Sequence, residues 1–291
     1  MTVLGLCCLD NEGYIKYNTI TKKRYESLSI NDKEKALEQI YGNNINTFSN
    51  AIQYCKDNNI AMYRVTSDLF PMLGIDEIGA SLFNEFKDEL KAVGNLTKKY
   101  KLRVVCHPSQ FNVLSSDNPE TVANTIQNLH FHALTFDYMG LSESRYNLIN
   151  IHGGKADRIK QLIKVVNLLP NNVKNRLTFE NDENSYSIDD LVQVYEATGV
   201  SVLFDFHHHL VMNKLKSYSS GYMEVAYEKA VNTWDNKALV TTHISNGTNN
   251  LHDRRHSDFI ELFPEFLSEV PFCEVEARSK NLAIIKLREL L

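Results

Sequence analysis

The feature that most constrains the fold of this chain is an alternation that repeats eight times along its 291 residues. Short apolar segments rich in β-branched residues are each followed by a longer segment with helical spacing of its apolar residues. The short segments, which we predict to be strands, lie at 2–8, 60–66, 101–107, 146–152, 176–181, 200–206, 239–245 and 272–277. The predicted helices lie at roughly 45–58, 78–99, 119–139, 156–169, 187–198, 222–235, 257–269 and 279–290.

This order of elements favours an α/β fold with parallel strands, because a helical crossover returns the chain to the same edge of the sheet. Eight such units predict a single closed (β/α)8 TIM barrel domain over residues 1–291. The alternative is an open doubly wound sheet. That fold usually has a glycine-rich phosphate loop after its first strand, and no GxGxxG occurs in this chain.

Composition limits the possible functions less sharply. The net charge is -5 with neutral histidines, whereas a simple nucleic-acid binder usually has a basic excess. Bound divalent cations would reverse the local field if some carboxylates were ligands. The five cysteines include no CxxC pair, so reduced thiols and an intracellular location are expected. We expect neither a signal peptide nor the ~20-residue apolar segment that spans a membrane.

Metal-binding residue types stand at the ends of six predicted strands. In a barrel these ends meet at one face, where active sites are found. The residues are His107, His152, Glu180, Asp205, His243 and Glu276. Several carboxylates and imidazoles in one barrel mouth are unfavourable unless cations neutralise them. Nitrogen and carboxylate ligands suit zinc, manganese or iron, and a central Glu180 can bridge two ions.

The segment "LFDFHHHLV" at 203–211 adds a run of three histidines. His208 lies three residues beyond Asp205, in a predicted loop, and can reach a neighbouring ion. We expect His207 and His209 to support the site or to face solvent. His256 is a further candidate ligand just before a predicted helix, and a plain polar loop is an equal alternative there.

Several longer motifs resemble one family, the UV damage endonucleases, a branch of metal-dependent barrel nucleases that includes the endonuclease IV type. They occur in family order and span nearly the whole chain. The motifs are "YRVTSDLFPM" (63–72), "CHPSQFNVLSS" (106–116), "NIHGGK" (150–155), "LTFENDENSY" (177–186), "LFDFHHH" (203–209), "THISN" (242–246), "RHSDFI" (255–260) and "VEARSKNLAIIKL" (275–287).

The resemblance implies a monomeric enzyme with up to three divalent ions, often Mn²⁺, although Zn²⁺ would also suit the ligands. Such enzymes nick damaged double-stranded DNA immediately 5′ of the lesion and leave a 3′-hydroxyl and a 5′-phosphate. Carried over by motif, the metal ligands are His107, His152, Glu180, Asp205, His208, His243, His256 and Glu276. Glu180 would bridge two ions, one completed by Asp205, His243 and Glu276 and the other by His107 and His152. His208 and His256 would hold the third ion. Glu180, Asp205 and His243 are the expected catalytic residues.

The same resemblance suggests how the lesion is recognised. Gln110 and Phe111 occupy the positions of a polar and an aromatic side chain that wedge into the duplex, and Phe111 could stack on an exposed base. The alternative for Phe111 is a place in the core. We also expect Asp10 near the DNA and Arg254 and Arg255 as phosphate contacts at the barrel mouth.

The chain departs from the family pattern at four positions. Leu6 and Phe111 stand where the family commonly has tyrosine, and Asp10 stands at or near an asparagine. Thr241 stands where the family has a lysine that can be carboxylated near the metals. Two other functions are therefore considered. One is a different metal-dependent barrel enzyme, such as an abasic-site endonuclease or a sugar isomerase. The other is a lesion-binding protein that does not cut.

Overall fold

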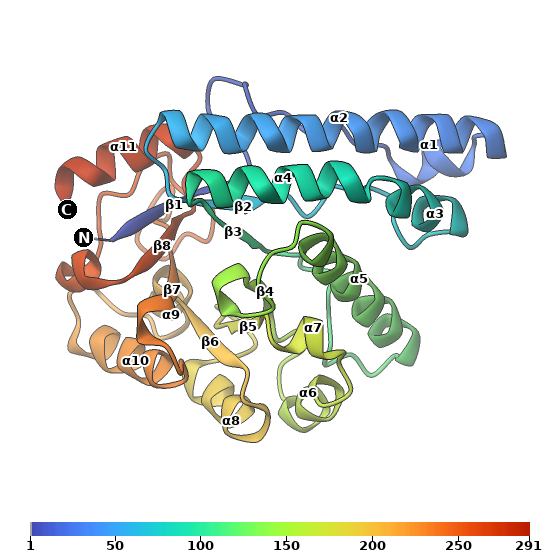
Figure 1. Cartoon of the computed structure of the whole chain (residues 1–291). Coiled ribbons are helices and arrows are strands. Elements are labelled where there is room, and N and C mark those ends of the chain that lie inside the picture. Colours follow the sequence, from blue (N-terminus) through green and yellow to red (C-terminus); the bar gives the residue numbers. More distant parts are fainter. Residues whose placement is uncertain (1) are drawn as a thin grey trace.

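The computed structural model describes residues 2–291 and contains a closed barrel of eight parallel strands, so the predicted fold class is confirmed. Figure 1 shows the strands surrounded by helices. Each strand pairs with the next along the chain, and β8 closes the barrel on β1. The strands are β1 (Val3–Cys7), β2 (Met62–Val65), β3 (Arg103–Cys106), β4 (Ile149–His152), β5 (Leu177–Glu180), β6 (Ser201–Asp205), β7 (Thr241–Ile244) and β8 (Phe272–Val275).

The helices form an outer layer, in which the long α2 lies beside α4 (Figure 1). They are α1 (Lys22–Glu26), α2 (Ile30–Asp57), α3 (Glu77–Glu85), α4 (Lys87–Tyr100), α5 (Pro119–Tyr138), α6 (Ile159–Val166), α7 (Asn171–Lys174), α8 (Ile188–Thr198), α9 (Phe206–Met212), α10 (Gly221–Asn232) and α11 (Lys280–Leu290). Short 3-10 helices are η1 (Arg145–Asn147), η2 (Lys237–Leu239) and η3 (Glu265–Glu269). Among residues 2–291, no helix combines the length and hydropathy needed to cross a bilayer.

Local sequence signals explain several helix boundaries. Ser187 caps α8 by accepting a hydrogen bond from the backbone N–H of Asp190, whose side chain bonds back to the Ser187 backbone. The helix ends at Gly199, whose φ of 71° is in the left-handed region that glycine adopts without strain. Asn118 caps α5 immediately before Pro119. These caps orient the helices that begin at the face where the strands end.

Three helix predictions differ from the structure. The predicted helix 78–99 is divided into α3 and α4 at Phe86, and 45–58 is the second half of the much longer α2. The prediction of a helix over 257–269 was wrong, because only the 3-10 helix Glu265–Glu269 forms there. Pro264 stands in the middle of that segment and cannot donate the backbone hydrogen bond that an α-helix needs.

The interior of the barrel is filled by both apolar and polar side chains. Alternate residues of a strand face the same side, so the residues two positions before the strand ends also point inward. Met62, Val105 and Leu203 form part of a compact apolar cluster there. Polar side chains of Arg64, Asn150, Thr178 and Glu274 are buried beside them, because Arg64 pairs in register with Val105. The buried polar groups therefore lie among the apolar ones in the layer beneath the strand ends.

Candidate metal centre

The candidate ligands from the strand ends converge at the C-terminal face of the barrel. Among residues 2–291, three groups have ligand atoms within 4.8 Å of one another. They are His107–Glu180–His243, His152–Glu180–His208 and Asp205–His243–Glu276. The structure therefore brings together seven of the eight ligands expected from the sequence.

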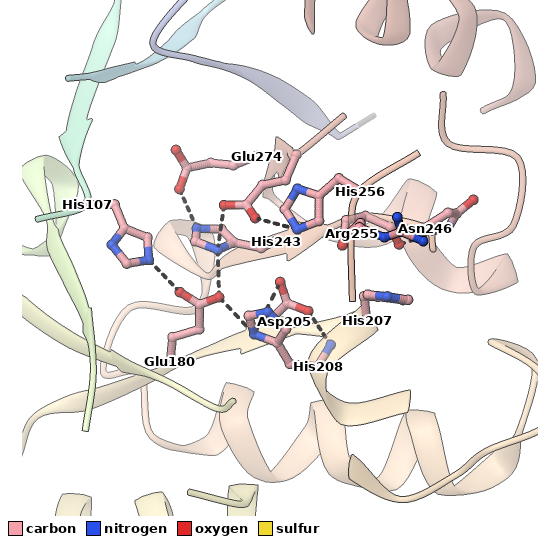
Figure 2. Close-up of polar contacts among 12 residues, drawn as sticks. His107, Glu180, Asp205, His207, His208, His243, Asn246, Arg255, His256 and Glu274 are labelled. Atoms are coloured by element: carbon pink, nitrogen blue, oxygen red, sulfur yellow. Dashed lines mark hydrogen bonds and ion pairs between the residues drawn. The ribbon is translucent and has the colours of Figure 1, made fainter. Parts of the chain in front are cut away.

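Glu180 lies at the centre of this arrangement (Figure 2). Its side chain is fully buried at the end of β5, and its two oxygens point in different directions. Oε2 lies 3.0 Å from Nε2 of His107, whereas Oε1 lies 3.0 Å from Nδ1 of His243 and 3.3 Å from Nδ1 of His208. The Glu180 carboxylate thus contacts three imidazoles that come from different segments at the barrel mouth. A ligand that bridges two metal ions requires such an arrangement.

Asp205 connects the centre to α9. The sequence predicted a loop around His208, but α9 begins directly after β6 and contains it. Oδ1 of Asp205 accepts a hydrogen bond of 2.6 Å from the backbone N–H of His208 and so caps the helix. Because His208 is in the first turn, its ring faces Glu180 and His152 rather than solvent.

The grouping of the histidines differs from the expected one in two respects. His107 and His152 have ring centroids 5.2 Å apart, but they belong to separate groups around Glu180. His256 belongs to none of the groups formed by the described residues. Its Nε2 lies 3.8 Å from Oε2 of Glu276, and the side chain is one-third exposed. His208 is grouped with His152 instead of His256.

The other histidines near the centre have partners of their own. His207 is buried and contacts the hydroxyl of Tyr218 and the carbonyl of Asp253 through its two ring nitrogens. His209 packs beside Phe204 and contacts the side chain of Asn213. Both therefore support the surrounding structure, as the sequence suggested.

Sequence reasoning missed a buried layer beneath the ligands. Asn150 donates a hydrogen bond of 2.5 Å to Oε2 of Glu180, and Thr178 in turn donates to Asn150. Arg64 and Glu274 form an ion pair of 2.8 Å below His243. Three of these residues lie two positions before a predicted ligand, so the period of two in a strand was the signal that could have identified them.

The buried carboxylates of the centre favour positively charged groups beside them. Burial alone would raise the pKa of Glu180, but the surrounding imidazoles lower it well below the usual range. Burial opposes the protonation of His243, yet Glu180 and the other glutamates raise its pKa to about 10. The pKa of His208 is raised well above its usual value because Asp205 and Glu180 more than offset burial. Burial raises the pKa of Asp205.

Two buried polar atoms without hydrogen-bond partners bear on whether these residues suit a metal ion. Oδ2 of Asp205 and Nδ1 of His152 have no hydrogen-bond partner among the residues that the structure describes. An unpaired buried carboxylate oxygen is costly, and a coordinated cation would satisfy it. The donor set of imidazole nitrogens and carboxylate oxygens fits Mn²⁺, Zn²⁺ or Fe²⁺. The residues present therefore fit a divalent metal centre.

Comparison with known proteins agrees with this geometry. The sequence profile described as UV-endonuclease UvdE matches residues 3–291. A protein named UV DNA damage endonuclease from a Nostoc species is 40% identical over 286 residues, which cover 98% of this chain and 89% of the relative.

The chain belongs to the UV-endonuclease UvdE family.

Other relatives extend this comparison. The UV DNA damage endonuclease of Deinococcus radiodurans is 38% identical, over 98% of this chain and 94% of the relative. The crystal structure of SacUVDE shares the fold with a TM-score of 0.84, at 24% identity over 100% of this chain and 99% of that one. Endonuclease IV from Thermus thermophilus has a TM-score of 0.57 at 11% identity, over 99% of this chain and 97% of that one.

The predicted lesion-contact residues of this UvdE family member lie in the loop after β3. Gln110 and Phe111 are both exposed, and Phe111 is 79% accessible to solvent. A core position for Phe111 is therefore excluded. An apolar ring held in water at the mouth of a barrel is available to stack on another flat apolar surface.

Asp10 is placed differently from Phe111. It is 7% exposed, and its two carboxylate oxygens accept hydrogen bonds from the backbone N–H groups of Tyr14 and Ile15. These bonds use both oxygens to hold the loop after β1. The Asp10 side chain therefore organises this loop and does not project from it.

The two arginines after β7 are exposed at the barrel mouth and engaged in surface ion pairs. Arg254 lies 2.6 Å from Oδ1 of Asn184 and 3.7 Å from Glu183. Arg255 forms a 2.7 Å pair with Asp253. Exposed pairs of this kind are weak, so a phosphate can replace the protein partner of either arginine.

Two of the departures from the family pattern are buried. Leu6 packs in the main hydrophobic core, and Thr241 donates a hydrogen bond of 2.9 Å to the carbonyl of Leu239. Neither side chain is among the metal-binding groups of the described residues. The seven clustered ligands are thus independent of both departures.

Proposed function

We propose that this chain is a metal-dependent DNA repair endonuclease that acts on duplex DNA with helix-distorting lesions, including UV photoproducts. It hydrolyses the phosphodiester immediately 5′ of the lesion and leaves a 3′-hydroxyl and a 5′-phosphate. The observation that carries the proposal is a set of three ligand groups joined by shared residues, in a chain that belongs to the UvdE family. Glu180 belongs to two of the groups, and His243 also belongs to two.

The roles of the residues follow from their positions. Glu180, His107, His152 and His208 would hold ions on one side of the centre, and Asp205, His243 and Glu276 on the other. His256, near Glu276 and more exposed, would complete the site at its outer edge. Up to three divalent ions, with Mn²⁺ as the proposed species, would activate water and stabilise charge on the phosphate. The buried carboxylates exclude bulk water from one side of the centre.

DNA recognition is assigned to the loops around the mouth. Phe111 and Gln110 would enter the duplex at the lesion, where base pairs are already weakened and unstacking is less costly. Arg254 and Arg255 would contact phosphates and position the strand without reading its sequence. A chain with a net charge of -5 relies on such local cations and on the metal centre to attract DNA.

The test is a nicking assay on an end-labelled duplex with one cyclobutane pyrimidine dimer, in the presence of Mn²⁺. Undamaged and abasic duplexes are the parallel substrates. Glu180→Gln removes the shared ligand, and Glu196→Gln makes the same change on the exposed surface of α8. We expect incision 5′ of the dimer by the wild type and by Glu196→Gln, and no incision by Glu180→Gln.

Other outcomes would point to the alternative functions. Incision at the abasic site alone would assign the chain to abasic-site repair. Tight binding of the dimer without any Mn²⁺-dependent cut would indicate a lesion-binding protein. Activity on a free sugar with no effect on DNA would indicate an isomerase.

A further inference from the structure

The loop after β3 carries a tight turn at its tip. Gln110 and Phe111 are the two central residues of this turn, which begins at Ser109 and ends at Asn112. The backbone N–H of Asn112 donates a hydrogen bond of 3.0 Å to the carbonyl oxygen of Ser109, which is the bond that closes a β-turn. Neither central residue is among the described non-glycine residues with positive φ, so the turn belongs to a class that accepts most side chains.

Asn112 closes the turn a second time through its side chain. Its Nδ2 donates a hydrogen bond of 2.9 Å to the same carbonyl oxygen of Ser109. Asn112 is 8% exposed, whereas Phe111 beside it projects into solvent. A buried amide is costly unless it is hydrogen-bonded, and here Nδ2 makes its bond within the turn. One buried residue therefore holds the turn through two hydrogen bonds.

The chain that follows the turn is fixed to two neighbouring elements. The backbone N–H of Val113 donates a hydrogen bond of 3.1 Å to Oγ1 of Thr125, a buried residue of α5. Oγ of Ser115 accepts a hydrogen bond of 2.7 Å from the backbone N–H of Lys155, in the loop after β4. A Cβ on Gly154 would lie 2.7 Å from Oγ of Ser115, so glycine allows the two loops to approach this closely. The turn therefore projects from an anchored base.

We propose that Asn112 is a positioning residue that holds Gln110 and Phe111, before DNA is bound, in the conformation that enters the duplex. A loop that becomes ordered only on binding loses backbone conformational entropy at that moment, and this loss weakens affinity. A turn that is already closed avoids the loss. The gain applies only where the two side chains enter the duplex, so Asn112 favours damaged over undamaged DNA. The inference rests on the function proposed above, in which these two side chains contact the lesion.

Two measurements test this role. Amide hydrogen exchange of the free protein, followed by NMR, shows whether the backbone N–H of Asn112 is protected without DNA. Fluorescence anisotropy gives the dissociation constants for undamaged duplex and for duplex with one cyclobutane pyrimidine dimer and a non-hydrolysable phosphonate linkage 5′ of it. The proteins are the wild type, Asn112→Ala, the double variant Gln110→Ala/Phe111→Ala and the triple variant. Asn58→Ala is the matched control, because its Nδ2 also donates a 2.9 Å hydrogen bond to a backbone carbonyl, that of Tyr54, but before β2 at the opposite end of the barrel.

We expect the Asn112 amide to be protected in the free wild type and the amide at this position to exchange faster in Asn112→Ala. Asn112→Ala should raise the dissociation constant for the dimer duplex about 3- to 10-fold, the equivalent of one net hydrogen bond. Its affinity for undamaged duplex, and its Mn²⁺ affinity measured by calorimetry without DNA, should stay within about twofold of the wild type, as should both duplex affinities of Asn58→Ala. In the background that lacks both probing side chains, Asn112→Ala should also change affinity by less than about twofold, because a positioning residue acts only through the groups that it positions.

The possible results separate this role from the proposed function. Rapid exchange of the Asn112 amide in the free wild type would overturn the inference, and this measurement needs no variant. An unchanged dimer affinity in Asn112→Ala, a loss that persists in the triple variant, or a weakened Mn²⁺ affinity would also overturn it, since Asn112 would then act elsewhere or not at all. Failure of the wild type to incise the dimer duplex while still preferring it would refute the proposed catalysis alone. Equal affinity of the wild type for damaged and undamaged duplex would refute both.

Discussion

Replacing Asp205 by asparagine should stabilise the metal-free protein and weaken its response to Mn²⁺. Asp205 is fully buried, and its Oδ1 caps α9 by accepting from the backbone N–H of His208. Asparagine caps helices about as well as aspartate, so Asp205→Asn keeps this bond. The change removes the negative charge and the Oδ2 oxygen that has no hydrogen-bond partner among the described residues.

The magnitude follows from these two features. An unsatisfied buried polar atom costs about 1–3 kcal/mol, and a charged one costs more. At about 2–4 °C per kcal/mol for a protein of this size class, the metal-free melting temperature should rise by about 2–12 °C. Mn²⁺ at about 100 times its dissociation constant should stabilise the wild type by about 2.7 kcal/mol. If the amide weakens affinity by about 10- to 100-fold, this gain falls to about 1.4–0.4 kcal/mol.

The assay is differential scanning calorimetry in excess EDTA and in Mn²⁺. Asp205→Ala is the comparison variant, because it removes the same charge together with the helix cap, which is worth about 0.5–2 kcal/mol. It should melt below Asp205→Asn in EDTA. The reasoning would be refuted if Asp205→Asn melted below the wild type in EDTA, or if Mn²⁺ raised the melting temperatures of both proteins equally.

Three further predictions concern the lesion loop, the helix packing and the pH response. Phe111→Ala should leave the melting temperature unchanged but weaken binding to dimer-containing duplex by about 1–3 kcal/mol, the value of one base-stacking contact. Fluorescence anisotropy would measure this binding, and an unchanged affinity would show that Phe111 does not stack on a base. Gly94→Ala should destabilise by about 1–3 kcal/mol or more in urea unfolding, because its Cβ would overlap the carbonyl oxygen of Met139. Gly42→Ala should instead stabilise α2 by about 0.5–1 kcal/mol, because a Cβ there would make only ordinary van der Waals contact with the ring of Phe86, at 3.7 Å. Mn²⁺ affinity should rise with pH, since the pKa of His243 is raised to about 10 and its Nδ1 must be free of a proton to bind metal. Each displaced proton gives up to about tenfold per pH unit below that pKa, and a calorimetric affinity independent of pH would contradict this.

The sequence predicted the barrel and the convergence of most candidate metal ligands because both depend on local patterns. Six strand ends carried metal-binding residues, and parallel strands bring their ends to one face regardless of the details of packing. Ser187 and Gly199 likewise marked the ends of α8 through local backbone chemistry.

Features set by longer-range contacts were not predictable in this way. His208 was expected in a loop, but the cap that Asp205 supplies begins α9 immediately after the strand. The pairing of Arg64 with Glu274 joins residues 210 positions apart in the chain. No local pattern shows that β2 and β8 lie on either side of β1 in the closed barrel. The segment 257–269 has apolar residues at helical spacing, but Pro264 prevents the helix.

The closure of the barrel by β8 has a consequence for biosynthesis. β8 pairs with β7 on one side and with β1 on the other. Glu274 lies within β8, and Glu276 follows directly after its last residue. A nascent chain that has emerged only as far as β7 already contains His107, His152 and Glu180, but it has two unpaired strand edges and no Glu276. The group of Asp205, His243 and Glu276 is therefore assembled only after the last strand has left the ribosome. Chains interrupted before that point lack Glu276 and therefore cannot assemble the complete set of candidate ligands.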